Sequence, residues 1–278
     1  MRVFKKKSKR VIVIGSNSFI AKYLIKIFKK NKINFLLINR KKIDLEKKNS
    51  TKYLSRIFRE DDTCIFIAAK VPVKNEEMFL SNILIARNIC EAIKHKKIKH
   101  LIYISSDAVY ADTKKKIKES SKKKPNSLHG LMHLTREIML KIAIDKKCLT
   151  IVRPTLIYGA GDPHNGYGPN QFLRLIKQNK NIQLFGKGEE LRDHIRVEDV
   201  ASMLYLIVKD NIIGEFNLVT GKIISFLNIA KKIINDNKSK MKIIFLKRNG
   251  KIPHNGYRAF HPSLLIKKFK NLKIKTFN

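Results

Sequence analysis

Cysteine is scarce in this sequence of 278 residues, and long hydrophobic runs are missing. The three cysteines, Cys64, Cys90 and Cys148, are far apart and lack metal-ligand spacing, which argues against a disulfide scaffold and suits a reducing cytoplasm. No apolar run approaches the roughly 20 residues that cross a bilayer. The first run, "VIVI", ends at Gly15, too early for the apolar core of about 7–15 residues in a signal peptide. We therefore expect a cytoplasmic protein with no membrane partner.

Acidic residues are scarce too, because 22 Asp and Glu stand against 60 Lys and Arg, for a formal net charge of +38. Such a field would attract nucleic acid, an anionic membrane or any anionic substrate. The charge is nevertheless spread along the chain, with only short clusters at 5–10, 114–118 and 122–124. Charge without a motif is a weak indicator of a partner, so we favour a compositional bias over a nucleic-acid partner.

Repeats and low-complexity linkers are absent, and the first 155 residues alternate short apolar runs with helical patterns. The expected strands contain "RVIVIG", "INFLLINR", "TCIFIAA", "HLIYISS" and "LTIVRPT". Unbroken apolar strands that alternate with helices indicate a parallel sheet covered on both faces. The predicted fold class is therefore α/β, with a doubly wound, Rossmann-like parallel sheet.

The composition changes near residue 157, where "YGAGDPHNGYGPN" marks a loop rich in Gly, Pro and Asn. We predict a smaller C-terminal substrate subdomain over the carboxyl ends of the strands, where open α/β sheets bind ligands. The expected dinucleotide-binding domain is 1–156 plus about 192–215, and the expected substrate-binding subdomain is 157–191 plus 216–278.

The stretch "VIVIGSNSFIAKYL" has the order strand, glycine, short loop and helix. A tight turn there would aim helix N–H groups at a pyrophosphate. Gly15 is kept, but Ser18 and Ala21 take the next two glycine places, and a purely structural turn would look the same. The position at the first strand favours a dinucleotide site, and its candidates are Gly15, Ser18, Phe19 and Ile20.

The second strand is followed by Asn39, Arg40 and Lys41. NAD-binding folds carry an acidic residue there for the ribose 2′-hydroxyl, whereas a basic pair suits a 2′-phosphate. We therefore expect NAD or NADP as the cofactor and lean slightly to NADP.

Six motifs follow one another along nearly the whole chain: "GSNSFIA" at 15–21, "IDL" at 43–45, "IFIAAK" at 65–70, "YISSDAVYAD" at 103–112, "VRPTLIYGAGD" at 152–162 and "LFGKGEELRDHIRVEDVA" at 184–201. In this order and spacing the chain resembles the extended short-chain dehydrogenase/reductase family, which comprises nucleotide-sugar epimerases, dehydratases and reductases. The resemblance implies hydride transfer at a sugar carbon, a nucleotide-sugar substrate and a homodimer.

The resemblance also implies roles for individual cofactor-binding residues. Asp44 and Leu45 would bracket the adenine. Ala68, Ala69 and Lys70 would line the cofactor at the end of the fourth strand. Ser106 would be the hydroxyl that hydrogen-bonds the reacting sugar oxygen.

On the substrate side the candidates are Asp107, Asn170, Arg192 and Arg258. Arg192 would grip the diphosphate, since a guanidinium makes paired bonds to phosphate; a surface ion pair with Glu189 or Asp193 is the alternative. For Asn170 a loop cap, and for Arg258 a solvated loop arginine, remain equally open.

The chain departs from the family in the helix that contains "SLHGLMHLTRE". His129 takes the place of the usual Tyr, and His133 takes the place of the Lys four residues later, so both rings should lie on one side. A Tyr, with a pKa of about 10, needs a cation to lower it, but a His starts near 6.5. We predict that His129 is the acid/base, and that a neutral His133 fits beside it and reaches a ribose hydroxyl.

Three rival interpretations remain open. The site could be dead, since a fold does not guarantee its chemistry. His-x-x-x-His is also the spacing of a zinc pair, but the zincin motif would require Glu at Gly130, and we expect no metal. Tyr110 or Tyr158 could supply the proton instead.

The related sugar 4,6-dehydratases carry Asp-Glu after the active hydroxyl, whereas Asp107 is followed here by Ala108. We therefore predict an NAD(P)-dependent nucleotide-sugar epimerase or keto-reductase. The alternative is a catalytically degenerate NAD(P)-fold protein that binds nucleic acid through its lysines.

Overall fold

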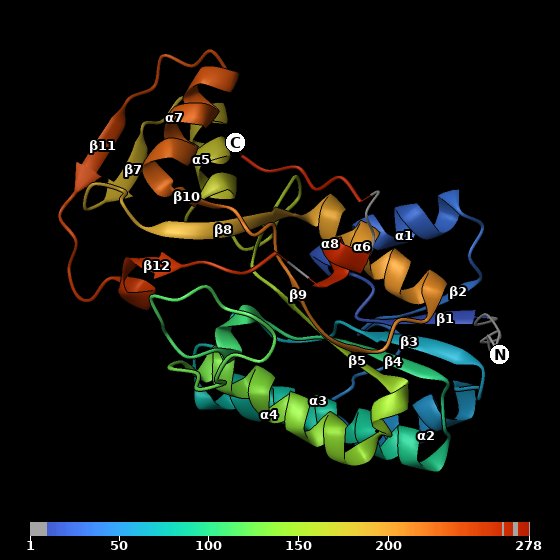
Figure 1. Cartoon of the computed structure of the whole chain (residues 1–278). Coiled ribbons are helices and arrows are strands. Elements are labelled where there is room, and N and C mark those ends of the chain that lie inside the picture. The colour runs from blue at the N-terminus through green and yellow to red at the C-terminus, as the bar shows by residue number, and fades with distance from the viewer. Residues whose placement is uncertain (1–9, 263, 269–271, 278) are drawn as a thin grey trace. The chain divides into compact units, whose positions relative to one another are not determined.

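The computed structural model describes residues 10–262, 264–268 and 272–277 (Figure 1). The chain forms two compact units. Unit 1 runs to Ala111 and adds Ser121–Pro154 and Val200–Asn217, and unit 2 comprises Asp112–Ser120, Thr155–Asp199 and the chain from Leu218 onward.

These bounds differ from the sequence-based ones mainly at 112–120 and 192–199, which group with unit 2. Long-range contacts place them there. Ile117 forms a bridge with Phe260, and the Asp193 carboxylate accepts hydrogen bonds from Thr220. The binding roles expected of the two units stay predictions.

Unit 1 contains a six-stranded sheet in the order β2-β1-β3-β4-β5-β9. Its strands are β1 (Arg10–Ile14), β2 (Phe35–Ile38), β3 (Asp62–Phe66), β4 (His100–Ile104), β5 (Leu149–Pro154) and β9 (Gly214–Leu218). The pairings from β2 through β5 are parallel, which confirms the predicted doubly wound sheet. Residues 68–70 follow β3, so they lie at the end of the third strand and not of a fourth.

Helices cover both faces of this sheet (Figure 1). One face carries α1 (Phe19–Lys30) and α6 (Val197–Asp210); the other carries α2 (Asn49–Ile57), α3 (Glu76–His95) and α4 (Leu128–Ala143). Side chains cap three helix starts, with Ser18 before α1, Asn75 before α3 and Ser127 before α4, because each satisfies a backbone N–H of the first turn.

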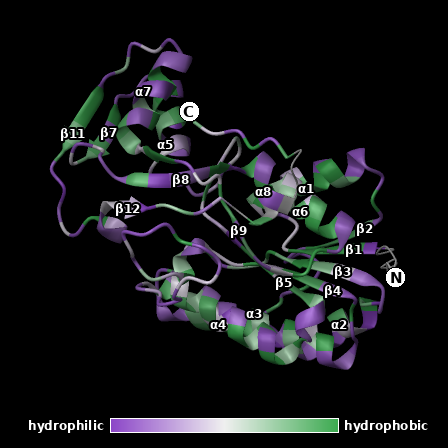
Figure 2. Cartoon of the chain, in the orientation of Figure 1, coloured by the Kyte–Doolittle hydropathy of each residue, from purple (hydrophilic) through white to green (hydrophobic). Residues whose placement is uncertain are grey.

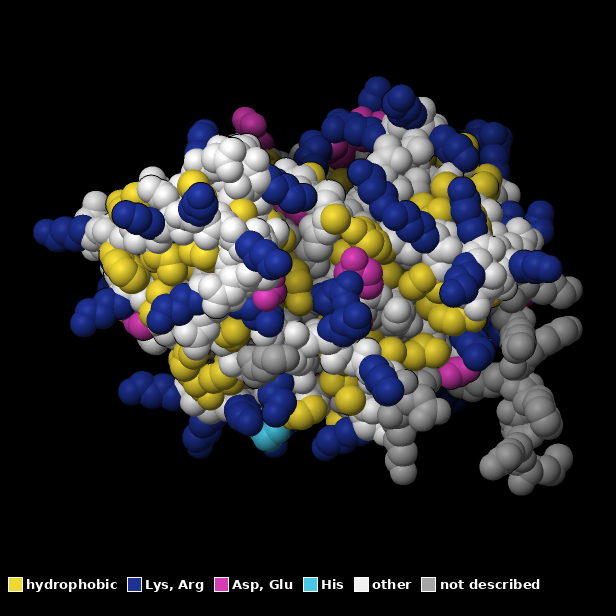
Figure 3. Space-filling model, turned by 90° about the horizontal axis from the view of Figure 1, so that it is seen from above, with side chains coloured by type: hydrophobic (Ala, Val, Ile, Leu, Met, Phe, Trp, Pro, Cys, Tyr) yellow, Lys and Arg dark blue, Asp and Glu magenta, His cyan; other side chains and the backbone are white. Residues whose placement is uncertain are grey.

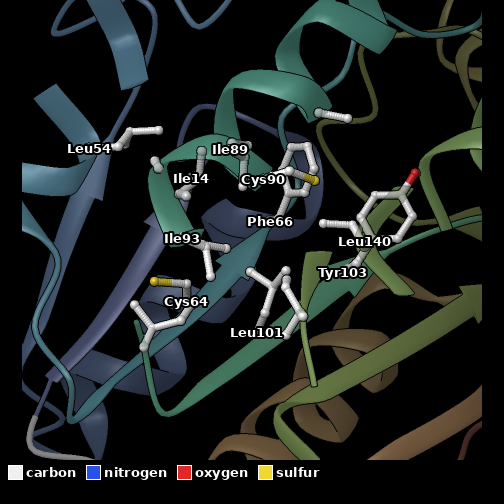
Figure 4. Packing of buried hydrophobic residues seen from close by; sticks show 14 of the residues in the cluster. Ile14, Leu54, Cys64, Phe66, Ile89, Cys90, Ile93, Leu101, Tyr103 and Leu140 are labelled. Carbon is white, nitrogen blue, oxygen red and sulfur yellow. The ribbon is translucent and has the colours of Figure 1, made fainter. Parts of the chain in front are cut away.

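One hydrophobic core cluster of unit 1 lies between the sheet and α2, α3 and α4 (Figure 4). Ile14, Phe66 and Leu101 from the strands meet Ile89 and Leu140 from the helices. The strands of this sheet are mostly hydrophobic apart from polar residues at their starts, while the helices alternate between hydrophobic and hydrophilic residues (Figure 2). This is the pattern of strands buried on both faces.

Unit 2 is built around β8 (Leu191–Arg196), which pairs with β6 (Leu156–Tyr158), β10 (Ile223–Ser225) and β12 (Tyr257–Arg258). A separate parallel pair joins β7 (Ile182–Phe185) to β11 (Ile243–Leu246). Its helices are α5 (Pro169–Lys177), α7 (Phe226–Asp236) and α8 (Leu264–Lys268). Phe172, Leu184 and Phe226 belong to its own hydrophobic core. Along the described residues, no helix combines the length and apolarity needed to span a bilayer.

Candidate active site

The loops that follow β1 and β3 meet at Gly15 and Ala68. Since β2 and β3 flank β1 on opposite sides, the carboxyl ends of β1 and β3 form the switch point where such sheets bind ligands. Gly15 has a φ of +96°, and a Cβ there would lie 2.5 Å from the backbone nitrogen of Ala68. This crossing therefore requires glycine.

The start of α1 fits the pyrophosphate of a dinucleotide. Ser18 caps the helix by accepting a hydrogen bond from the Ala21 N–H at 3.2 Å, and Phe19 and Ile20 form its first turn. That turn contains no acidic side chain, so the positive end of the helix dipole stays available to an anion.

Two buried asparagines of α3 hold the loops that contain the other predicted cofactor residues. Asn88 donates to the Leu45 carbonyl at 2.8 Å. Asn82 accepts from the Lys70 N–H and donates to the Lys70 carbonyl, at 3.0 and 2.9 Å. Sequence reasoning missed both, although two asparagines on the apolar side of a helix were a usable signal.

The residues after β2 form a small charged cluster. The Asn39 side-chain oxygen accepts from the Lys41 backbone N–H, so it closes a turn. Arg40, whose side chain is 69% exposed, lies 3.4 Å from Asp44 and 3.5 Å from Glu46. The Glu46 backbone N–H, and then the Arg40 cation, hold the pKa of Asp44 below its ordinary value. A 2′-phosphate would compete with both carboxylates for Arg40.

The two histidines lie together on α4, as the spacing predicts. Their rings meet edge to face with centroids 4.8 Å apart. His129 is half-buried, and His133 is 5% exposed. The first turn of α4 packs on the turn η1 (Asp107–Val109). The two backbones are so close that a Cβ on Gly130 would lie 2.2 Å from the Ala108 carbonyl oxygen.

Ser106 caps η1 by accepting from the Ala108 N–H at 3.2 Å, and its hydroxyl lies 3.4 Å from an Asp107 oxygen. The contact between Gly130 and Ala108 thus places the backbone of α4 next to His129 against the turn that contains Ser106 and Asp107. A hydroxyl and an imidazole are the groups that proton transfer to a sugar oxygen requires.

His133 Nδ1 lies 2.8 Å from the Tyr103 hydroxyl. Burial, with smaller effects from His129 and Arg136, holds the pKa of His133 well below its ordinary value. His133 is therefore neutral near pH 7, and Tyr103 occupies one of its two nitrogens. Sequence reasoning missed this contact, because nothing local links β4 to α4.

A buried ion pair fastens α4 to the sheet. Arg153 of β5 donates to both oxygens of Glu137, each at 2.7 Å, and to Glu215 at 2.5 Å. Ser105 donates to Glu137 at 2.6 Å. This network holds the helix that contains the histidines against the end of β4.

Tyr110 is hydrogen-bonded to the same buried network. Its hydroxyl donates to Asn217 at 2.8 Å and accepts from Arg153 at 3.0 Å, and the residue is 2% exposed. Tyr110 is therefore structural and is disfavoured as the proton donor. Tyr158 belongs to unit 2 and stacks on Phe277 at 4.5 Å, and burial raises its pKa to about 12.

In unit 2, Arg192 forms an ion pair, but with a partner that the sequence analysis did not name. Arg192 donates to Glu190 at 2.7 Å and to the Pro253 carbonyl at 2.5 Å, and both side chains of the pair are 5% exposed. The pair with Glu190 is buried, so it is not the surface ion pair that was the alternative to a diphosphate contact. Arg192 could grip a diphosphate only in competition with Glu190.

The other candidates of unit 2 also have internal partners. Asn170 caps a loop by accepting from the Gly159 N–H at 3.0 Å. Arg258 is 3% exposed and lies 3.3 Å from Asp112, so it is not a solvated loop arginine. His254 binds the same carboxylate at 2.5 Å.

Two other classes of site, a metal site and a nucleic-acid surface, can be compared with the structure. Within the described part of the chain, no three His, Cys, Asp or Glu residues gather as a metal site. On the face drawn in Figure 3, Lys and Arg side chains are spread among hydrophobic and neutral ones. A nucleic-acid surface would instead gather lysines beside exposed aromatic rings.

Sequence comparisons relate this chain to one enzyme family. A sequence model of the NAD dependent epimerase/dehydratase family matches residues 11–218. The dTDP-D-glucose 4,6-dehydratase of Dictyostelium discoideum is 28% identical over 279 residues, which cover 81% of this chain and 62% of that enzyme. The chain thus spans less than two thirds of that relative's length.

Two solved structures share the fold. The UDP-glucose 4-epimerase of Thermus thermophilus, in complex with NAD, has a TM-score of 0.81 at 19% identity and covers 96% of this chain and 95% of its own. The dTDP-4-dehydrorhamnose reductase of Bacillus anthracis, in complex with NADP, has a TM-score of 0.79 at 20% identity and covers 98% of this chain and 95% of its own.

Proposed function

We propose that this chain, which belongs to the NAD dependent epimerase/dehydratase family, is an NAD(P)-dependent nucleotide-sugar epimerase or keto-reductase in which His129 replaces the usual tyrosine. The observation that carries the proposal is the position of His129. The next residue, Gly130, packs on the turn that Ser106 caps, and the His129 ring contacts the ring of a neutral His133.

Unit 1 would hold the dinucleotide. Gly15 and the start of α1 would receive the pyrophosphate, while Leu45 and Ala68 belong to loops that are fixed from α3 and α4. The exposed Arg40 favours NADP, and the two carboxylates beside it favour NAD. We retain the slight preference for NADP, because a guanidinium at this place binds a 2′-phosphate.

When bound, NAD or NADP supplies hydride exchange with a sugar carbon. His129 would take the proton from the sugar hydroxyl and return it, and the Ser106 hydroxyl would position the reacting oxygen. A neutral His133 places no second positive charge beside the protonated His129. A lysine in its place would oppose that protonation.

Several named relatives are dTDP-glucose 4,6-dehydratases. The proposal nevertheless excludes water elimination, because Ala108 follows Asp107 where those enzymes would carry a glutamate. With Asp107 as its one carboxyl group, the turn lacks one of the two groups, a base for the carbon-bound proton and an acid for the leaving hydroxyl, that the elimination needs.

The first test is binding and turnover by the purified chain. NAD and NADP should each raise the melting temperature, because a ligand of the native state stabilises it. A panel of nucleotide sugars should then reveal a substrate. His129→Ala should lower kcat roughly 100-fold or more while leaving the dinucleotide shift unchanged.

The matched control is His95→Ala, which removes an exposed histidine outside the proposed site and should keep full turnover. Full turnover by His129→Ala would refute its role as acid/base. Binding of a dinucleotide without turnover of any sugar in the panel would favour the degenerate binding protein.

A further inference from the structure

Tyr103 reaches from β4 to the histidine helix. Its ring packs in the core of unit 1, and its hydroxyl oxygen points out of that cluster (Figure 4). There the oxygen lies 2.8 Å from His133 Nδ1, and the two residues are only 1% and 5% exposed. A hydrogen bond this well buried has no competition from water.

The direction of this bond follows from Arg136. Its guanidinium stacks on the rings of Phe66 and Tyr103, at 4.3 and 5.5 Å, and donates to the Ala68 carbonyl at 2.9 Å. A guanidinium has only donors, so it cannot accept the phenolic proton. Burial also raises the pKa of Tyr103, which keeps the hydroxyl protonated. The Tyr103 O–H therefore donates, and His133 Nδ1 accepts.

An accepting Nδ1 fixes the tautomer of His133. In a neutral imidazole only one nitrogen is protonated, so the proton must reside on Nε2. A second proton, on Nδ1, would break the bond and place a cation beside His129 and Arg136. Glu137 cannot balance that charge, since Arg153 and Ser105 already engage it.

We propose that Tyr103 is a positioning residue whose hydroxyl holds His133 as the neutral imidazole with its proton on Nε2. The consequence for binding rests on the proposed function. His133 then offers one fixed N–H donor to a ribose hydroxyl, whereas a lysine would offer three rotatable donors. The hydroxyl of Tyr103 thus supports a cofactor contact from the side opposite the ligand.

The decisive measurement uses the unaltered protein. Nitrogen NMR of 15N-histidine-labelled chain, with His133 assigned from its absence in His133→Gln, should show a protonated Nε2 and a bare Nδ1 from pH 5.5 to 8. A proton on Nδ1, or an imidazolium within that range, overturns the proposal.

Tyr103→Phe tests the cause. It should convert His133 to a mixture of tautomers and weaken dinucleotide binding roughly 2- to 10-fold, the effect of one lost neutral hydrogen bond. Thr150→Val is the matched control, because it removes the hydroxyl 2.8 Å from Nε2 of the buried His100. It should change the signals of His100 and leave those of His133 and the dinucleotide affinity as they were.

The outcomes separate the two proposals. The expected tautomer in a chain that binds no dinucleotide supports the role of Tyr103 and refutes the proposed function. Dinucleotide binding with a proton on Nδ1 refutes the role of Tyr103 alone. A single Nε2-protonated tautomer that persists in Tyr103→Phe also refutes it.

Discussion

At the scale of single residues, Gly15 shows how one position couples two loops. Its φ of +96° and its approach to Ala68 leave no room for a side chain. We predict that Gly15→Ala lowers the free energy of unfolding by about 2–4 kcal/mol and abolishes dinucleotide binding, as measured by urea denaturation and thermal shift.

Gly166→Ala is the control for this prediction, since a Cβ there would meet nothing within 4 Å. It should change stability by less than about 0.5 kcal/mol. If Gly15→Ala were as stable as Gly166→Ala, the loops that follow β1 and β3 would have room for a side chain at Gly15, and the prediction would be wrong.

The sequence shows which residue types stand at the site positions, but it does not predict which residues they contact. The spacing of His129 and His133 predicts the ring contact, because helix geometry is local. The bond to Tyr103, 30 positions earlier in the chain, depends on how β4 packs against α4. For the same reason the sequence could not show that Arg192 pairs with Glu190 inside unit 2.

At the scale of elements, Glu215 of β9 ties β5 and α4 together through Arg153 and Lys141. Burial by itself would raise the pKa of Glu215, but hydrogen bonds from Lys141 and Arg153 outweigh burial and lower that pKa to about 2. A carboxyl with a lowered folded-state pKa stabilises the protein above its unfolded value, near 4.3, and loses that contribution as the pH falls toward 2.

We therefore predict that Glu215→Gln costs about 1–3 kcal/mol at pH 7, after allowance for partial solvent exposure. The difference from the unaltered protein should shrink as the pH falls from about 5 toward 2. Urea denaturation at several pH values measures it. Glu60→Gln, whose side chain is 80% exposed, should cost little at any pH, and a pH-independent cost at Glu215 would contradict the ion-pair explanation.

Element positions were the most predictable part of the fold. Unbroken apolar runs became buried strands, and "SLHGLMHLTRE" became the start of α4. The stretches 112–120 and 192–199 group with unit 2, unlike in the sequence-based bounds, because distant pairings decide to which unit they belong. Local sequence carries no trace of those pairings.

At the scale of the whole molecule, α3 and α4 lie side by side in unit 1 (Figure 1), and both expose large apolar side chains. Leu80 and Leu84 on α3 are 59% and 41% exposed, and Leu131, Ile138 and Ile142 on α4 are 43%, 50% and 81% exposed. The resemblance to the family predicts a homodimer through the helices that flank the site. We propose that this surface joins two copies of the chain.

Light scattering after gel filtration should accordingly give twice the chain mass. Leu131→Glu combined with Ile142→Glu should yield monomers, because paired carboxylates would have to be buried at the interface. Ile244→Glu in unit 2, at a site that is 40% exposed, should leave the dimer intact. A monomeric unaltered protein at tens of micromolar would refute the proposal.

Local sequence predicted the α/β class, the glycine turn after β1 and the two histidines on one side of a helix, because hydrophobic periodicity and helix geometry are set by near neighbours in the chain. Only the tertiary structure decided that Tyr103 meets His133, that Arg136 is buried against two rings, and that Arg153 engages Tyr110 and Glu137. Each of those contacts joins elements that are remote in sequence. Their partners are chosen by packing and by the need to satisfy buried polar groups, which no local pattern encodes.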